Sequence, residues 1–150
     1  MVKKKESLCK TSGKFNVTLV LTAEQAYTLM EALEFFSRIH MGQFDTLEYN
    51  LQMDVYDKSL KRPKYDREDA RMYLQKAKEV IFGLDHPGAY IGISHTSKRS
   101  REAWDIYQQL RHVITLYRQP DEPLENRGNA YDKVYSLSDE PLPKVTIIEE

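Results

Sequence analysis

The segment 96–118 constrains the fold most, because it reads as a long amphipathic helix with clear signals at both ends. Thr96 to Ser100 supply hydroxyl caps, and Pro120 closes the helical pattern after about Arg118. Its apolar residues recur at helical spacing, so one face has to be buried against another element. That face consists of Ala103, Ile106, Tyr107, Leu110, Val113, Ile114 and Tyr117.

Three further helices are predicted upstream of this segment. The first has Thr22 and Gln25 as a capping box and ends near Gly42. The second covers about residues 44–60, and the third runs from a cap at Asp66 to Phe82. The expected inner face of the third helix consists of Ala70, Tyr73, Leu74, Ala77 and Ile81.

Short strands are predicted at both ends of the chain. Residues 15–21 alternate between apolar and polar side chains, which is typical of a half-buried strand. Residues 89–93, 133–137 and 144–148 also resemble short strands. The predicted fold class is therefore α+β, with about four helices and a small antiparallel sheet formed by the N-terminal strand and the C-terminal arm.

The composition favours one domain with a well-solvated surface. The chain has 150 residues, of which 41% are hydrophobic, and a net charge of −1. We expect a flexible basic tail at 1–12 and a single globular domain at 13–150, with a Pro-rich arm from about 119. The near-zero net charge disfavours general nucleic-acid binding, and no apolar run is long enough to span a membrane. With only Cys9 available, a disulfide within the chain is excluded, and a cytoplasmic location is expected.

Polar residues follow one face of the predicted 96–118 helix. They step by four and three positions, so they lie next to the apolar face. Such a face is often only the solvated side of a helix. This one carries His, Gln and Thr instead of the Lys and Glu of an idle surface, so it is a candidate ligand site. Its members are Arg101, Asp105, Gln108, His112 and Thr115.

Arg111 adds a second feature to the same helix. It lies four residues after Tyr107 and seven after Trp104, which suits a guanidinium stacked on an aromatic ring. An arginine among aromatics could hold a nucleobase or a phosphate. Alternatively, Trp104 and Tyr107 are simply core residues.

Two other places could bind an anion. The turn between the first two helices holds Gln43 and Asp45 at a helix N-terminus, where ordinary capping by Asp45 is the alternative. The loop before the last helix contains Lys98 and Arg99 among hydroxyl side chains. There a phosphate site and a solvated capping loop fit equally well.

Recognised enzyme and metal motifs are absent from the sequence. It has no Gly-rich phosphate loop, no nucleophile elbow and no paired cysteines, and its four histidines are spaced unlike a zinc site. The sequence therefore favours a non-enzymatic protein without a cofactor or metal. A hydrolase using Asp105, His112 and a metal is a minor alternative.

Two short motifs resemble a family of small bacteriophage and prophage proteins. They are Gly42-Gln43-Phe44-Asp45 and Trp104-Asp105-Ile106-Tyr107-Gln108, the latter followed by Arg111-His112. The resemblance covers roughly residues 19–117 and brings no reaction with it. The resemblance implies a protein that acts by binding either host proteins or the nucleotide messengers of host defence.

The function expected from these observations is capture of a small nucleotide-like or phosphorylated ligand, which would blunt a host defence signal. The alternative is a protein–protein inhibitor of a host enzyme that uses tyrosines and the C-terminal arm. Homo-oligomerisation is open in both cases. The predicted ligand residues are Arg101, Asp105, Gln108, Arg111, His112, Gln43, Asp45, Lys98 and Arg99.

Overall fold

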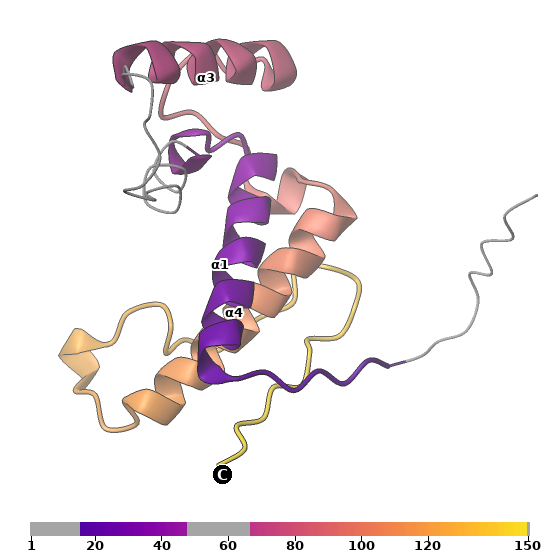
Figure 1. Cartoon of the computed structure of the whole chain (residues 1–150), viewed down its shortest axis with the longest axis vertical. Coiled ribbons are helices and arrows are strands. Elements are labelled where there is room, and N and C mark those ends of the chain that lie inside the picture. Colours follow the sequence, from indigo (N-terminus) through magenta and orange to yellow (C-terminus); the bar gives the residue numbers. More distant parts are fainter. Residues whose placement is uncertain (1–15, 48–66, 150) are drawn as a thin grey trace, which may run out of the picture.

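The regular structure is helical throughout the part of the chain that the computed structural model describes, residues 16–47 and 67–149. It contains the α-helices α1 (Ala23–His40), α3 (Arg67–Phe82) and α4 (Lys98–Arg118), and the 3-10 turns η1 (Ile93–His95) and η2 (Leu124–Asn126). Figure 1 shows α1 and α4 side by side, with α3 lying across one end of the pair. The C-terminal arm, which runs from orange to yellow in Figure 1, follows α4 as a long loop that contains η2.

The helix ends lie where the capping residues predict them. The Thr22 hydroxyl accepts from the Gln25 amide at 3.3 Å, and the Gln25 side chain accepts from the Thr22 amide at 3.0 Å. Gly42 follows the last turn of α1 with φ +79°, a conformation that favours glycine. Ser97 caps α4 by accepting from the Ser100 amide. These predictions are confirmed.

The core lies where α1 and α4 pack against each other. Ser37, near the end of α1, meets Ser100, near the start of α4, and donates to the Ser100 carbonyl at 3.1 Å. At the other end, the Arg118 guanidinium of α4 stacks over Tyr27 of α1, so the two helices are antiparallel. Both serines are fully buried, and such small side chains let the backbones approach closely. The buried apolar residues of the described ranges are Met41, Phe44, Ala103, Tyr107 and Leu110.

The predicted antiparallel sheet is wrong, since no residue in the described ranges belongs to a β-strand. Residues 16–20 are extended, but Val17 and Val20 are each 76% exposed. In the C-terminal arm, the amides of Leu137 and Ser138 donate to the Asp105 side chain instead of to a neighbouring strand. Apolar–polar alternation marks a segment able to form a strand, but a sheet also needs a partner edge. The described ranges supply none, so the fold is helical and not α+β.

The apolar segment 89–93 is not an edge strand either. Within this segment, the Ile91 amide donates a hydrogen bond to the Met41 carbonyl at 3.0 Å, the one backbone bond to a distant part of the described chain. Gly92 then caps the 3-10 turn η1, which leads directly into the cap of α4. A single backbone hydrogen bond to the end of α1 is therefore present where the hydrogen-bond pattern of an edge strand was predicted.

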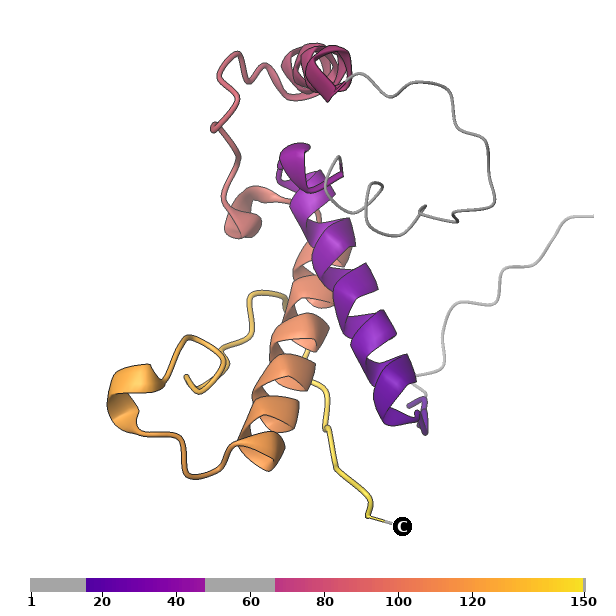
Figure 2. The same cartoon turned by 60° about the vertical axis from the view of Figure 1, so that its left-hand side comes forward.

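Helix α3 departs from its predicted packing. Tyr73 and Ile81, expected on the inner face, are 69% and 64% exposed. Lys78 is instead buried, and its Nζ donates to the Pro87 carbonyl at 2.6 Å. Figure 2 shows α3 almost end-on, standing clear of α4. The predicted second helix, 44–60, is helical at residues 45–47 and otherwise lies outside the described residues.

Candidate functional site

The predicted anion loop at the start of α4 is closed by its own contacts. The Thr96 hydroxyl donates to the Ile93 carbonyl, and the Ser97 hydroxyl accepts from Ser100. Arg101 Nη1 donates to the Thr96 carbonyl at 2.6 Å, which fastens η1 to the helix. Lys98 and Arg101 are both bonded within the chain, whereas the third cation of the loop, Arg99, is exposed. The loop works as a cap, which was the alternative to a phosphate site.

Lys98 forms an ion pair with the C-terminal arm. Its Nζ lies 2.9 Å from Glu140 Oε1 and 3.5 Å from Glu102 Oε1. The hydrogen bond and the charge of Glu140 raise the pKa of Lys98, so the lysine is cationic across the physiological range. This predicted ligand residue therefore holds the arm.

Asp105 is the strongest anchor for the arm. It is 3% exposed, and its carboxylate accepts from the Leu137 and Ser138 amides at 2.8 and 2.9 Å. The hydroxyls of Ser138 and Ser136 donate to the same carboxylate at 2.7 and 3.1 Å. Four donors can compensate a buried negative charge without a cation beside it. Asp105 is thus saturated by this chain.

The remaining polar groups of the predicted face do not converge either. His112 Nδ1 donates to the Ala130 carbonyl at 2.9 Å and fixes another part of the arm. Gln108 Oε1 accepts from Arg111 Nη2 at 2.6 Å. Arg101, Asp105 and His112 therefore share a face as predicted, but this face docks the C-terminal arm.

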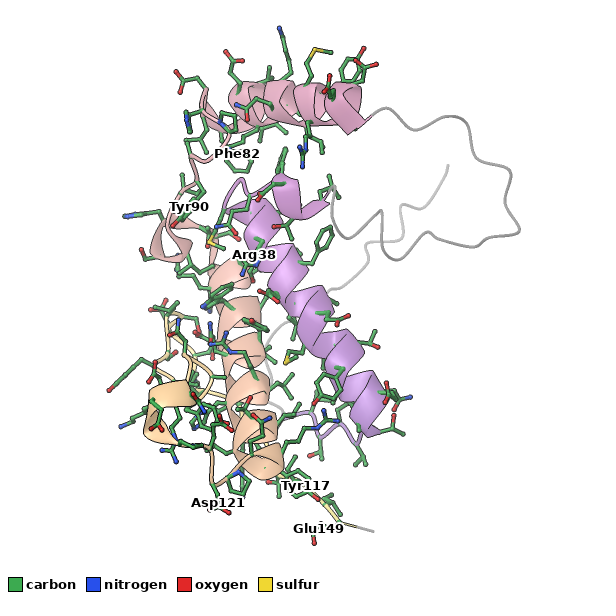
Figure 3. The ribbon with its side chains drawn as sticks, turned by 90° about the vertical axis from the view of Figure 1, so that its left-hand side faces the viewer. Arg38, Phe82, Tyr90, Tyr117, Asp121 and Glu149 are labelled. Carbon is green, nitrogen blue, oxygen red and sulfur yellow. The ribbon has the colours of Figure 1, made fainter. Side chains whose placement is uncertain are left out.

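The turn after α1 is also internally bonded. Arg38 bridges Glu34, at 2.7 Å, and the Oε1 of Gln43, also at 2.7 Å. Asp45 is exposed at the first helical residue after the turn. Figure 3 labels Arg38 at one end of the α1–α4 pair and Tyr117 at the other. Gln43 and Asp45 are therefore not brought together with the C-terminal half of α4.

A hollow that the sequence analysis did not identify lies between α1 and the C-terminal half of α4. Its volume is about 230 Å³. Two guanidinium groups contribute to its wall, and none of its lining residues is acidic. The lining residues are Tyr27, Met30, Arg111, Ile114, Thr115, Arg118 and Gln119.

Arg111 is the predicted ligand residue that reaches this hollow. Its Nη1 donates to the Tyr107 hydroxyl at 3.3 Å, and its guanidinium carbon lies 5.3 Å from the centre of the Tyr107 ring. The predicted stacking on an aromatic is therefore present. Its Nε is buried and has no hydrogen-bond acceptor. A buried N–H without an acceptor is costly, so this nitrogen is an unsatisfied donor next to the hollow.

The surroundings of Arg111 keep its partner Tyr107 neutral. Burial raises the pKa of Tyr107, and the nearby Glu34 carboxylate raises it further against the opposing effect of Arg111. The tyrosine hydroxyl therefore remains protonated at neutral pH and accepts from Arg111. The guanidinium of Arg111 is held in place by Tyr107 and Gln108 together.

Arg118 is the functional candidate that sequence reasoning missed. Its guanidinium carbon lies 4.8 Å from the centre of the Tyr27 ring across the helix pair. The signal was available, since Arg111, Thr115 and Arg118 lie at i, i+4 and i+7 and so share one side of the helix. The predicted polar face that starts at Arg101 ends at Thr115, which lines the hollow, but Arg118 was not included in it.

Neither a metal site nor a membrane-spanning helix is found in the described residues. The described residues contain no group of three or more His, Cys, Asp or Glu side chains placed to hold a metal ion. None of the helices in these ranges is long and apolar enough to cross a bilayer. Comparison with known proteins gives no match to any family model, curated protein or solved structure.

Proposed function

We propose that this chain is a non-enzymatic binding protein that takes the anionic group of a small phosphorylated or nucleotide-like ligand into the hollow between α1 and α4. The observation that carries the proposal is that Arg111 and Arg118 line one hollow that has no acidic residue in its lining. Arg118 supplies a second guanidinium on the same wall. Planar guanidinium groups bind phosphate oxygens through paired hydrogen bonds, which suits this chemistry.

Binding fits the hollow better than catalysis does. Its lining offers guanidinium, hydroxyl and amide groups, but no carboxylate, imidazole or thiol that could act as a general base or nucleophile. Asp105 and His112, the pair considered for a hydrolase, hold the C-terminal arm. Retention of an intact ligand is therefore the proposed outcome.

The resemblance to small phage proteins adds a biological setting to this proposal. A protein that retains a phosphorylated messenger without converting it would lower the free concentration of that messenger. Sequestration of a nucleotide signal of host defence, in the host cytoplasm, is the form of the function that we propose.

Calorimetry with the full chain tests the proposal. The panel is inorganic phosphate, adenine nucleotides, cyclic nucleotides and ADP-ribose, titrated at low salt because salt screens partly exposed charges. We expect micromolar binding of at least one ligand and recovery of that ligand unchanged. Arg118→Gln should weaken binding about tenfold or more, the value of one charge-assisted hydrogen bond. Lys76→Gln, which removes an exposed cation on α3, is the matched control. No heat with any member of the panel would refute the proposal.

A second candidate function is inhibition of a host enzyme through a protein–protein interface. The specific observation in its favour is the number of large apolar side chains exposed in the described ranges. Besides Tyr73 and Ile81 of α3, they include Val80, Tyr90, Tyr117, Tyr135 and Ile148. Ile81 also belongs to the lining of an apolar hollow of about 260 Å³, together with Ile39, His40, Phe44 and Phe82. Tyrosine-rich apolar surfaces are typical of interfaces.

A pull-down from bacterial lysate distinguishes the two candidates. A stoichiometric host protein that is lost with Tyr73→Ser and Ile81→Ser, but retained with Arg118→Gln, would favour the interface. Retention of a small ligand that is lost with Arg118→Gln alone would favour the hollow.

A further inference from the structure

We infer that the α1–α4 hollow selects a terminal phosphate group in its dianionic form, and that Tyr131 of the C-terminal arm orients Gln119 as a third donor. This inference rests on the proposed function and names the chemical class of its ligand. A terminal phosphate has three free oxygens and close to two negative charges at neutral pH, whereas a phosphodiester has two free oxygens and one charge.

The first two donors are the guanidinium groups. Arg111 Nη1 and Nη2 each make one hydrogen bond, to Tyr107 and to Gln108, and each nitrogen carries a second N–H that can donate to a ligand. Within the described ranges, the contact found for Arg118 is the stack on Tyr27, so its N–H groups are open to an acceptor. Two positive charges on one wall match a dianion better than a monoanion.

The third donor is the side-chain amide of Gln119. The Tyr131 hydroxyl donates to Gln119 Oε1 at 3.1 Å, with the Gln119 carbonyl oxygen 3.3 Å away as a second acceptor for the same hydrogen. Because Oε1 accepts from Tyr131, the NH2 group is the end of the amide that remains to donate. Gln119 also lines the hollow. The three donor groups could therefore each bind one of the three free oxygens of a terminal phosphate.

The charged groups around the hollow favour the same ligand. On the arm, the Arg127 guanidinium lies 5.4 Å from the centre of the Tyr131 ring and adds positive charge behind Gln119. On α4, His112 is turned to the Ala130 carbonyl. On α1, Tyr27 is in the wall, and the carboxylate of Glu34 is paired with Arg38 and lies close to Tyr107. No carboxylate or histidine is among the lining residues, so we assign the expected pH dependence to the ligand.

Matched ligands test this selection by calorimetry on the full chain. Adenosine 5′-monophosphate and cyclic adenosine 3′,5′-monophosphate share a base and differ in having a terminal or an internal phosphate. We expect the terminal phosphate to bind about tenfold tighter or more, because it gains one charge-assisted hydrogen bond. Its affinity should fall about tenfold between pH 7.5 and pH 5, since the second phosphate pKa is about 6. Sulfate keeps its two charges over this range, so its affinity should stay constant.

Variants test the role of Tyr131 as a positioning residue. Tyr131→Phe removes the hydroxyl that fixes Gln119 and should weaken the terminal phosphate about three- to tenfold. The preference over the cyclic ligand should shrink at the same time, which a loss of stability alone would not produce. Tyr135→Phe, on the same arm and exposed, is the control and should bind like the parent.

The outcomes separate this inference from the proposed function. If both ligands bind equally, or if phosphate and sulfate share one pH profile, selection of the dianion is wrong while the binding function stands. If Tyr131→Phe keeps the full preference, the role of Tyr131 is wrong. If no member of the pair binds and neither do phosphate and sulfate, the inference and the proposed function fall together.

Discussion

The N-terminal and C-terminal halves of helix α4 differ in where their polar side chains find partners. In the first half, Lys98, Arg101 and Asp105 are all bonded to other parts of the same chain. In the second half, His112 also bonds the arm, but Arg111 keeps a buried donor without an acceptor, and Arg118 contacts an aromatic ring. The charged side chains of the first half are therefore used within the fold, whereas Arg111 and Arg118 line a hollow, where we propose that they bind a ligand.

Substitutions in the two halves should therefore separate stability from binding. A change in the first half should lower the free energy of unfolding and leave the hollow intact as long as the chain is folded. A change at Arg118, in the second half, should alter ligand affinity with little effect on stability. Substitutions at Asp105, Ser100, Arg118 and Lys98 test this division, in order of decreasing expected effect.

Asp105→Ala should have the largest effect on stability. It removes the buried acceptor of four hydrogen bonds that hold the arm to α4. We expect a loss of about 2–4 kcal/mol, because hydrogen bonds to a charged group are strong and several break together. Urea denaturation measures the loss, and hydrogen exchange at residues 137 and 138 shows whether the arm is released.

The control for this prediction is Asp139→Asn, which changes an exposed carboxylate on the same arm. It should leave the urea midpoint unchanged. The comparison between the two halves of α4 breaks down if Asp105→Ala keeps parental stability and protected arm amides.

Ser100→Leu should have the next largest effect. Ser100 is fully buried where α4 meets Ser37 of α1, so a larger side chain forces the helices apart. Overpacking of this kind costs about 1–3 kcal/mol. Ser100→Ala is the matched control. Its hydroxyl is buried without a partner, so removing it should be neutral or stabilising by about 1 kcal/mol. Thermal unfolding of both variants shows whether each one raises or lowers stability. If Ser100→Leu is more stable than the parent, α1 and α4 do not pack closely at this position.

The helix ends and the α1–α4 core could be predicted from sequence because they depend on local signals. Thr22, Gln25 and Gly42 act on neighbouring backbone groups, and the apolar spacing of Ala103, Tyr107 and Leu110 marks the side of α4 that is buried. The sheet could not be settled in this way, since strand pairing depends on a distant segment. The amides of Leu137 and Ser138 met the carboxylate of Asp105 instead of another strand.

The candidate site was predictable in its helix but not in its exact residues. The polar face of α4 was correctly located, yet its use depends on the path of the C-terminal arm, which has no helical periodicity. Arg111 was identified through its spacing from aromatics, whereas Arg118 depends on Tyr27, which is 91 positions earlier in the chain. The face of α3 was mispredicted because Lys78 found a carbonyl at Pro87, a bond that periodicity does not show.

Arg118→Gln tests the second half of α4, where we expect a loss of ligand affinity and little loss of stability. The substitution removes a cation–π contact with Tyr27, and such a contact at an exposed site contributes about 0.5–1 kcal/mol. The free energy of unfolding should therefore fall by no more than this amount, while ligand affinity falls about tenfold. Chemical denaturation and calorimetry on the same preparation measure both. A large loss of stability would show that Arg118 serves the fold, as Asp105 does.

Lys98→Gln should have the smallest effect, although Lys98 bonds the arm as Asp105 does. The Glu140 carboxylate raises the pKa of Lys98 above its ordinary 10.5, so the pair stabilises the folded state at neutral pH. For a raised pKa, this stabilisation is complete below the unfolded-state value and disappears as the pH rises through the folded-state value. The Lys98 side chain is exposed, however, and solvent screens the pair. We therefore expect the unfolding midpoints of the parent and the variant to be nearly equal at pH 7 and to coincide once the pH has risen through the folded-state pKa of Lys98. A large difference between the two unfolding midpoints at pH 7 that disappears in high salt would contradict this expectation. It would show that the ion pair with Glu140, and not only the buried Asp105 carboxylate, holds the arm.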